Sequence, residues 1–368
     1  MKNTKHIIIL IAAIIISCVA NATVRTLNNN NPTPGQYNAW IFVQAASSPG
    51  DTVYVSGSLL SYGDITVTVF NLTIIGTGHN PQKQNPLISQ FDDIHSIVGQ
   101  LTLIGIKCHE VHDDSVLGLT IFKAENCYFS GTIYLGLSSG LSNTTCQFRN
   151  NIFGRSYQKI YSLHVNAANT FGLQGEIDNN IFYGNIEINN PDPYYGYMDG
   201  CNMSNNIFIS PDYGIAKLCN SEVKYDNSIF SNNILINYTD LNFYYQTLTS
   251  PNNSTVACMN NESYPGYAPF THVQNTIGNF YGDPLFVNFP CLSTPCSFSY
   301  TLDFHLQPTS PLIGAGTGGT DIGVYGGPYG SSFTMTGEPR IPQMKQVNMP
   351  ATVVSGSTFS VNIISTNK

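Results

Sequence analysis

A four-residue phrase, Asn-Asn-Ile followed by Phe or Leu, recurs through the middle of this 368-residue chain. Its copies begin at Asn150, Asn179, Asn205 and Asn232, and a degenerate copy begins at Asn126. The spacing of these copies falls in the range of roughly 20 to 50 residues that indicates a stacked architecture, in which no single unit buries its apolar face alone. Because each unit is short and strand-like, the repeat predicts an all-β fold, a parallel β-helix.

The paired asparagines have a structural explanation. Asparagine tolerates the left-handed backbone conformation that a sharp bend requires. Stacked asparagine side chains can also hydrogen-bond along a column and so satisfy the amides at the bend. The isoleucine and phenylalanine that follow supply core volume. We therefore interpret the Asn-Asn pairs as structural rather than catalytic.

A second phrase extends the repeat toward the N-terminus. The segment Leu72–Gly76, which reads Leu-Thr-Ile-Ile-Gly, returns one repeat later as Leu101–Gly105, and Leu119–Phe122 is a related form. Toward the C-terminus we trace the repeat at least to Asp283–Val287. These phrases predict regular coils on both sides of the asparagine-containing copies.

The stack is expected to span about residues 50–327, which makes roughly eleven coils at about 25 residues each. Connections between parallel strands are almost always right-handed, so we expect a right-handed helix. Residues 23–35 read as a polar leader, and Gln36–Ser48 contains a short amphipathic helix placed to cover the open end of the stack. The expected organisation is a signal peptide (1–22), a right-handed parallel β-helix with its N-terminal cap (23–330), and a small C-terminal β segment (331–368) that packs on the last coil.

The N-terminus has the form of an export signal. Lys2 and Lys5 precede a largely apolar run, Ile7–Val19, which is too short to span a bilayer. The following Ala20–Ala22, Ala-Asn-Ala, is a small-x-small cleavage site. The pattern predicts Thr23 as the first residue of the mature protein.

An alternative reading of the same region is a lipid anchor. Ile15–Cys18 resembles a bacterial lipobox, which would place a lipid on Cys18. No later apolar run is long enough to cross a bilayer, so we expect no transmembrane helix. Both readings predict a protein that is secreted or held at the cell surface.

Composition narrows the functional classes. Charged residues make up 10% of the chain, against about 25% in typical globular proteins. The formal net charge is -8, and no basic region is concentrated enough to indicate nucleic-acid binding. Abundant aromatic and β-branched residues argue against disorder and favour strands.

The wide scatter of the cysteines is unlike a zinc site, which requires cysteines in close pairs. Cys291 and Cys296 close a Pro-containing loop and form a candidate disulfide in an exported protein. Cys127 lies in a strand-like run, where a buried thiol fills core space.

Three segments together resemble a known superfamily. Ser48–Val55, Ser-Pro-Gly-Asp-Thr-Val-Tyr-Val, is similar to the opening of right-handed β-helix proteins of the pectate-lyase-like superfamily, and Leu302–Gly316 and Thr320–Gly327 are similar to their closing phrase. The resemblance covers about residues 36–330 and is closest to exported, mostly uncharacterised members from Bacteroidetes-type bacteria. It implies the fold but no single activity, because the superfamily includes polysaccharide lyases, glycoside hydrolases, epimerases and surface proteins without known chemistry.

Ionisable residues are densest between Lys107 and Asp114, with Asp92, Asp93 and His95 about one coil earlier, where they could stack nearby. Histidine titrates near neutral pH, so a histidine here could act as a general base. The alternative is a solvated polar loop at a coil corner. The candidate catalytic residues are His109, Glu110, His112, Asp113 and Asp114.

The resemblance adds a candidate ion to this region. Lyases of the superfamily use carboxylates to bind calcium, which implies a calcium site at Asp92 and Asp93, with Asp113 and Asp114 as further oxygen donors. The catalytic Asp-Asp, Gly-His-Gly and Arg-Ile-Lys pattern of polygalacturonase-type members is absent from the chain, and Gly76–His79 is only a partial echo of it.

Candidate substrate-binding residues lie further along the chain. Tyr194, Tyr195 and Tyr197 fall in a Pro- and Gly-containing segment expected to project as a loop, where aromatic rings could pack on sugar rings. Arg149 and Arg155 could bind an acidic sugar. The alternatives are that tyrosine is simply a good strand residue and that the arginines are solvated.

Two functions therefore remain open from the sequence. The first, favoured because no catalytic set of the superfamily is intact, is an exported β-helix that presents loops to a polysaccharide or a cell-surface glycan. The second is a polysaccharide lyase or glycoside hydrolase that acts near residues 92–114. They differ in whether the acidic and histidine residues converge in one groove.

Overall fold

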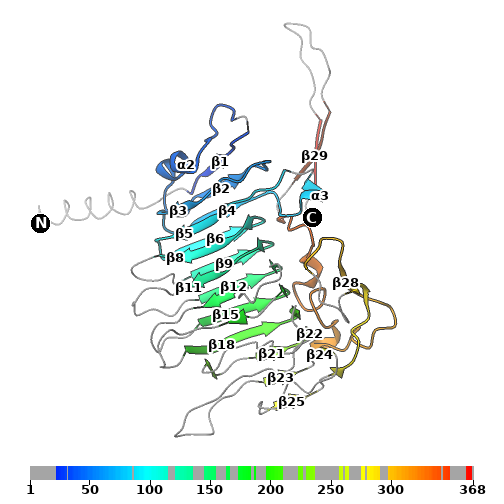
Figure 1. The fold of residues 1–368 in the computed structure, drawn as a ribbon. Coiled ribbons are helices and arrows are strands. Elements are labelled where there is room, and N and C mark those ends of the chain that lie inside the picture. The colour runs from blue at the N-terminus through cyan, green and yellow to red at the C-terminus, as the bar shows by residue number, and fades with distance from the viewer. Residues whose placement is uncertain are drawn as a thin grey trace, which may run out of the picture.

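The chain folds into a parallel β-solenoid, as the repeat predicts (Figure 1). A computed structural model gives the fold, and the described parts of the chain are residues 22–30, 32–84, 87–114, 121–135, 145–154, 163–165, 173–183, 186–187, 196–209, 223–226, 229–236, 257–259, 262–264, 275–277, 280–290, 297–340, 343–348 and 362–366. The signal segment, Arg155, Tyr194, Tyr195 and the cysteines at 291 and 296 lie outside these residues, so the predictions made on them stay predictions.

Three parallel sheets run along the stack, here named sheets 1, 2 and 3. Within the described residues, sheet 1 contains twelve strands. In spatial order they are β1 (Val24–Leu27), β2 (Thr52–Val55), β4 (Leu72–Ile75), β6 (Gln100–Ile104), β9 (Ile121–Glu125), β12 (Thr145–Arg149), β15 (Leu173–Asp178), β18 (Gly196–Ser204), β21 (Ile229–Ser231), β23 (Ala257–Met259) and β25 (Asn275–Ile277), with β20 (Val223–Asp226) also paired to β18.

Sheets 2 and 3 complete the coils. Sheet 2 consists of β7 (Lys107–Cys108), β10 (Tyr128–Phe129), β13 (Ile152–Phe153), β16 (Ile181–Tyr183), β19 (Ile207–Ile209), β22 (Ile234–Ile236), β24 (Glu262–Tyr264) and β26 (Phe280–Tyr281). Sheet 3 consists of β3 (Ile65–Val67), β5 (Asp93–Ser96), β8 (Glu110–Asp113), β11 (Ile133–Leu135), β14 (Leu163–Val165) and β17 (Ile186–Glu187). A coil passes through sheets 3, 1 and 2 in turn, as β5, β6 and β7 do. The hand of the winding stays a prediction from the general rule for parallel crossovers.

The first asparagine of each pair forms the bend between sheets 1 and 2. Asn150, Asn179, Asn205 and Asn232 have φ values of 58, 56, 58 and 55°, and Asn126 has 54°. These values lie in the left-handed region, which asparagine enters more readily than most residues. The predicted bend is therefore confirmed.

The second asparagine of each pair forms a buried ladder. In each step of the ladder, the Nδ2 of one asparagine donates to the Oδ1 of the asparagine on the next coil at 3.0 Å. The steps run from Asn151 to Asn180, from Asn180 to Asn206 and from Asn206 to Asn233. The same Oδ1 atoms accept backbone N–H groups at 2.9 Å. The ladder thus satisfies polar groups that water cannot reach, which confirms the structural reading of the pairs.

The isoleucine and the phenylalanine of the phrase enter two different cores. Phe153, Phe182 and Phe208 stack inside the solenoid with ring centroids 4.5 and 5.0 Å apart. Ile181 and Ile207 are equally buried but belong to a second cluster on the outer side of sheet 2. Side chains alternate across a strand, so neighbouring residues must face opposite sides of the sheet.

A C-terminal strap, described over residues 283–290 and 297–340, covers the outer side of sheet 2. It begins with the antiparallel pair β27 (Phe286–Asn288) and β28 (Asp303–Leu306) and contains the short 3-10 helices η2 (Thr317–Gly319) and η3 (Gly330–Ser332). Its side chains Phe304, Leu312 and Ile322 are buried in the second cluster. The expected continuation of the repeat through residues 283–327 is therefore wrong: among the described residues, β26 is the last strand of the parallel sheets, and the closing phrase belongs to the strap.

The strap runs back along the stack over the bends. Asn232 Oδ1 accepts the backbone N–H of Thr317 at 3.0 Å, and Asn179 Nδ2 donates to the carbonyl of Val324 at 2.8 Å. Further along, the N–H of His79 donates to the carbonyl of Thr336 at 3.0 Å. The start of the tail consequently lies on early coils rather than on the last coil, which corrects that expectation. Beyond the strap, β29 (Gln343–Asn348) and β30 (Asn362–Thr366) form an antiparallel pair.

The N-terminal end is closed by a strand and a helix. Residues expected to form a polar leader include β1, which pairs in parallel with β2, so that expectation is wrong. The predicted helix is present as α2 (Trp40–Ala46), which lies beside β1 (Figure 1). Its Trp40 and Val43 are buried in the inner core. A second helix, α3 (Pro81–Gln84), follows β4. Among the described residues, no helix is long and apolar enough to cross a membrane.

Cysteines inside the coils act as core residues. Cys108, Cys127 and Cys146 are free thiols with no solvent exposure. Burial raises the pKa of Cys127 to about 12, so this thiol stays protonated and unreactive. The prediction that Cys127 fills core space is confirmed.

Candidate functional site

The acidic and histidine residues lie on the outward face of sheet 3, on β5 and β8. Along β5, Asp93 and His95 are partly exposed while Ile94 is buried. Along β8, Glu110 and His112 are partly exposed. The alternation of a β-strand therefore places one carboxylate and one imidazole of each strand on the same open face.

The register brings these two strands into line. Asp93 lies opposite Glu110, and His95 lies opposite His112. The coil that joins them is shorter than the asparagine-containing coils further along the chain. The segments Asp-Ile-His and Glu-Val-His are thus the same pattern on adjacent coils, which confirms that residues 92–95 stack next to the later cluster.

The imidazoles form a column with a tyrosine. The rings of His95 and His112 stack with centroids 4.7 Å apart and an interplanar angle of 9°. His112 and Tyr134 of β11 stack at 4.7 Å and 18°. In the backbone register, His164 is the next position of this column. Because each ring covers its neighbour's face, the ring edges, which carry the nitrogens, are the parts that a ligand meets.

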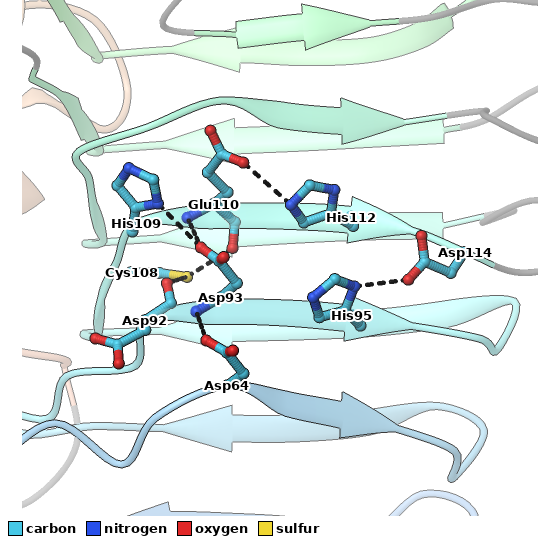
Figure 2. A network of polar contacts seen from close by, with 9 residues as sticks. All are labelled: Asp64, Asp92, Asp93, His95, Cys108, His109, Glu110, His112 and Asp114. Carbon is cyan, nitrogen blue, oxygen red and sulfur yellow. Dashed lines mark hydrogen bonds and ion pairs between the residues drawn. The ribbon is translucent and has the colours of Figure 1, made fainter.

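Each of the three histidines contacts a carboxylate (Figure 2). His95 Nδ1 lies 2.6 Å from Asp114 Oδ2, His109 Nδ1 lies 3.0 Å from Asp93 Oδ1, and His112 Nε2 lies 3.1 Å from Glu110 Oε2. These contacts fix the direction of each imidazole.

Backbone groups hold the carboxylates in place. The N–H of Glu110 donates to Asp93 Oδ1 at 3.1 Å, and the N–H of Asp93 donates to Asp64 Oδ1 at 3.2 Å (Figure 2). The carboxylates of Asp64 and Asp93 are therefore each bonded to the main chain of the next coil. Such anchoring makes Asp93 the centre of the cluster.

Five of the residues expected to be catalytic or metal-binding come together here: Asp93, His109, Glu110, His112 and Asp114. Two do not. Asp113 has no solvent exposure because the alternation of β8 turns its side chain to the other side of the sheet. Asp92 is exposed, and its carboxylate points away from the imidazoles (Figure 2).

An open hollow lies next to the cluster, on the side of Asp92. Its volume is about 370 Å³, and it is lined by Gln90, Phe91, Asp92, Asp93, Lys107, Cys108, His109 and Ser130. Burial lowers the pKa of Lys107, whose ammonium group lies 5.9 Å from the centre of the Tyr128 ring. The hollow therefore combines carboxylates with one amine beside the histidines.

Two of the proposed sugar-binding residues, Arg149 and Tyr197, are described, and both lie on sheet 1 rather than on this face. Arg149 lies on sheet 1, where it pairs with Glu176 and stacks over the ring of Tyr329 at 4.1 Å. Tyr197 belongs to strand β18 of sheet 1, opposite Lys224, and so does not lie in a projecting loop. Any role of Tyr197 in binding stays a prediction.

The sequence placed His95 near the cluster without assigning it a role, and it did not indicate Tyr134 or Asp64. Tyr134 falls outside the dense acidic stretch and gave no local signal. For His95, the signal was present in the repeated carboxylate-x-histidine pattern at 93–95 and 110–112. Residues two apart share one face of a strand, so aligning the two segments would have paired both positions.

The arrangement offers two overlapping groups of potential metal ligands. Nitrogen or oxygen atoms of Asp93, His95 and His112 all lie within 4.8 Å of one another, and the same holds for Asp93, His109 and Glu110. Both groups share Asp93. The face can therefore donate hydrogen bonds, exchange protons or hold a cation.

Fold and site together define a parallel β-solenoid with a histidine–carboxylate cluster on an open sheet face. Comparisons with protein-family models, with curated proteins and with solved structures gave no match. Any assignment of function therefore rests on the residues and geometry of this chain.

Proposed function

We propose that the protein binds an extended, neutral glycan along the outward face of sheet 3. The observation that carries the proposal is the column of His95, His112 and Tyr134, which successive coils present in register beside Asp93 and Glu110. Adjacent strands are about 4.8 Å apart, so a linear polymer lying along the stack meets equivalent groups at regular intervals. The resemblance to carbohydrate-active β-helices supports the same class of ligand.

The chemistry of the face suits sugar hydroxyls. Ionised carboxylates accept hydrogen bonds from hydroxyl donors, and such charge-assisted bonds are about twice as strong as neutral ones. The imidazole edges can donate or accept. Hydroxyl groups on one sugar ring can therefore be bound by Asp93 or Glu110 together with His112.

The charged residues of this face indicate that the bound glycan is neutral rather than acidic. Lys107 is the lysine that lines the adjacent hollow. Five carboxylates of the described residues lie in the hollow or in the histidine–carboxylate cluster: those of Asp64, Asp92, Asp93, Glu110 and Asp114. A face with this excess of negative charge repels a polyanion.

Binding is tested by titrating the mature chain with neutral and uronate-containing oligosaccharides, with metal removed by a chelator. We expect neutral chains to bind and Glu110→Gln or His112→Ala to weaken them about tenfold or more, since a lost hydrogen bond to a charged group is worth about 1.5–3 kcal/mol. His305→Ala is the matched control, because His305 pairs with Asp303 on the strap at 2.6 Å. Absence of binding to any glycan, or equal binding by all three variants, would disprove the proposal.

A second function, cleavage of the bound chain, is favoured by one further feature. Asp93 and Glu110 offer oxygens within 4.8 Å of each other, and each contacts a histidine. Retaining glycosidases place their two carboxyl groups about 5–5.5 Å apart, one as acid and one as nucleophile. Release of reducing ends by the wild type but not by Asp93→Asn would establish cleavage. If the wild type binds glycan and releases no product, the protein binds the glycan without cleaving it.

A further inference from the structure

Asp93, His95 and His112 have the spacing of an open metal site. Their ligand atoms lie within 4.8 Å of one another. A tetrahedral ion with bonds of about 2.0–2.1 Å has ligand atoms about 3.3 Å apart. The side chains must therefore draw together by only about 1.5 Å at most to reach bonding distance of such an ion, which partly exposed side chains can do by small rotations.

The histidines are oriented for this role. Asp114 holds Nδ1 of His95 at 2.6 Å, and the other ring nitrogen of His95 lies on the side turned toward Asp93 (Figure 2). Metal-binding histidines nearly always donate their second ring N–H to a carboxylate or carbonyl, which fixes the ring and its tautomer. Asp114 therefore acts as a positioning residue for His95.

The third ligand is held on the neighbouring coil. His112 Nε2 faces Glu110 Oε2 at 3.1 Å, so the Glu110 carboxylate lies next to the site as a potential fourth donor. The two strands are paired in register, and Asp93 accepts the N–H of Glu110 at 3.1 Å. The ligands thus stand on hydrogen-bonded strands rather than on loops, and such support makes a site rigid.

The donor set selects the class of ion. Calcium takes six to eight oxygens, whereas two imidazoles with one or two carboxylates suit zinc and its neighbours in the first transition row. The calcium site expected at Asp92 and Asp93 would require Asp92, whose carboxylate points away from the imidazoles (Figure 2). We propose that Asp93, His95 and His112 form a binding site for a divalent transition-metal ion of the zinc class. This inference does not depend on glycan binding.

The test uses the mature chain, stripped of metal with a chelator and titrated with Co²⁺, whose visible absorption reports nitrogen and oxygen ligation. We expect one Co²⁺ per chain, displaced by Zn²⁺ and not by millimolar Ca²⁺, because affinities for nitrogen-containing sites rise along the transition series. Asp93→Asn, His95→Ala and His112→Ala should each weaken binding at least tenfold. Asp114→Asn should weaken it about 10–100-fold, as loss of a supporting carboxylate typically does.

Controls separate this site from its alternatives. His305→Ala removes an exposed histidine that also pairs with an aspartate, so it should bind Co²⁺ as the wild type does. His109→Ala should also retain binding; loss in this variant alone would assign the ion to the overlapping group of Asp93, His109 and Glu110 and overturn the proposal. Circular dichroism of the metal-free variants checks folding, and His95→Gln, which preserves side-chain size, replaces His95→Ala if the latter unfolds.

Two further results would overturn the inference. One is wild-type protein that takes up no Co²⁺ or Zn²⁺ and shows no change in melting temperature with either ion. The other is stoichiometric displacement of Co²⁺ by Ca²⁺, which would indicate an oxygen-only site. Because no glycan is present in these experiments, their failure would leave the proposed glycan binding to be judged on its own test.

Discussion

Thr23 is held by the buried carboxylate of Asp51. The backbone N–H of Thr23 donates to Oδ1 at 2.6 Å, and its hydroxyl donates to Oδ2 at 2.7 Å. The N–H of Ser48 and the guanidinium of Arg25 contact the same carboxylate. Burial by itself would raise the pKa of Asp51, but these partners outweigh it and hold that pKa below its usual value.

This contact has a consequence for export, if the signal is removed before Thr23. Cleavage would turn the Thr23 amide into a charged amino group facing Asp51, and so strengthen the contact. We expect mass analysis of the exported protein to show Thr23 as its first residue. A lipid on Cys18 would contradict this and place the protein at a membrane surface.

Replacing Asp51 tests the same contact through stability. Asp51→Asn should lower the free energy of unfolding of the mature protein by about 2–3 kcal/mol, because hydrogen bonds to a charged group are worth about 1.5–3 kcal/mol. Since the folded pKa is lowered, the wild type should lose this advantage as the pH falls below the usual pKa of an aspartate. Urea titrations at pH 7 and pH 3 measure both effects. Asp64→Asn, at an exposed residue, serves as the control.

The asparagine ladder predicts a large cost for one amide. Asn180 is fully buried, bonds to Asn151 and Asn206 and donates to the carbonyl of Phe148 at 2.9 Å. Asn180→Ala leaves several buried groups without partners, each costing about 1–3 kcal/mol, so we expect a loss of at least about 3 kcal/mol in urea unfolding. Asn71→Gly is the control: Asn71 is exposed with φ 55°, which glycine adopts freely. Equal stability of the two variants would contradict the ladder's role.

Ile181 and Phe182 should differ in what they hold together. Ile181 lies under the strap, whereas Phe182 lies inside the coils. A buried, unpaired charge is strongly unfavourable, so Ile181→Asp should release the strap to limited proteolysis while the coils persist. Phe182→Ala should instead lower the stability of the whole stack by about 3–5 kcal/mol. Simultaneous cleavage throughout the chain in Ile181→Asp would show that strap and coils unfold as one unit.

Asp178 predicts a distinct pH dependence. Burial raises its pKa to about 6, an effect that the hydrogen bond from Ser204 only partly offsets. Between about pH 4 and pH 6 the folded state therefore holds a proton that the unfolded state has lost, so this group makes stability fall as the pH rises. Asp178→Asn should remove that contribution and be more stable than the wild type at pH 7 by on the order of 3 kcal/mol. A difference between the two proteins that does not change from pH 4 to pH 7 would exclude the effect.

The features that the sequence predicted correctly are local. Each depends on residues within one coil or on adjacent coils that carry the same phrase. The Leu-Thr-Ile-Ile phrase lies opposite its copy in register, with Leu72 paired to Leu101. The related segment Leu119–Phe122 does not follow this rule. A match by letters would pair Leu101 with Leu119, but Leu101 pairs with Phe122. Coil lengths vary, and matching letters alone do not define the register once a corner gains or loses residues.

The repeated phrase by itself determined the parallel stack, the left-handed bend and the asparagine column, because each depends on residues that recur at the same place in every coil. Tertiary structure decided the rest. Ile181 is buried by strap residues that lie far along the chain, a contact that no local pattern encodes. The site likewise depends on the short coil that sets His95 against His112, and on the strand alternation that brings Glu110 into the cluster while burying Asp113.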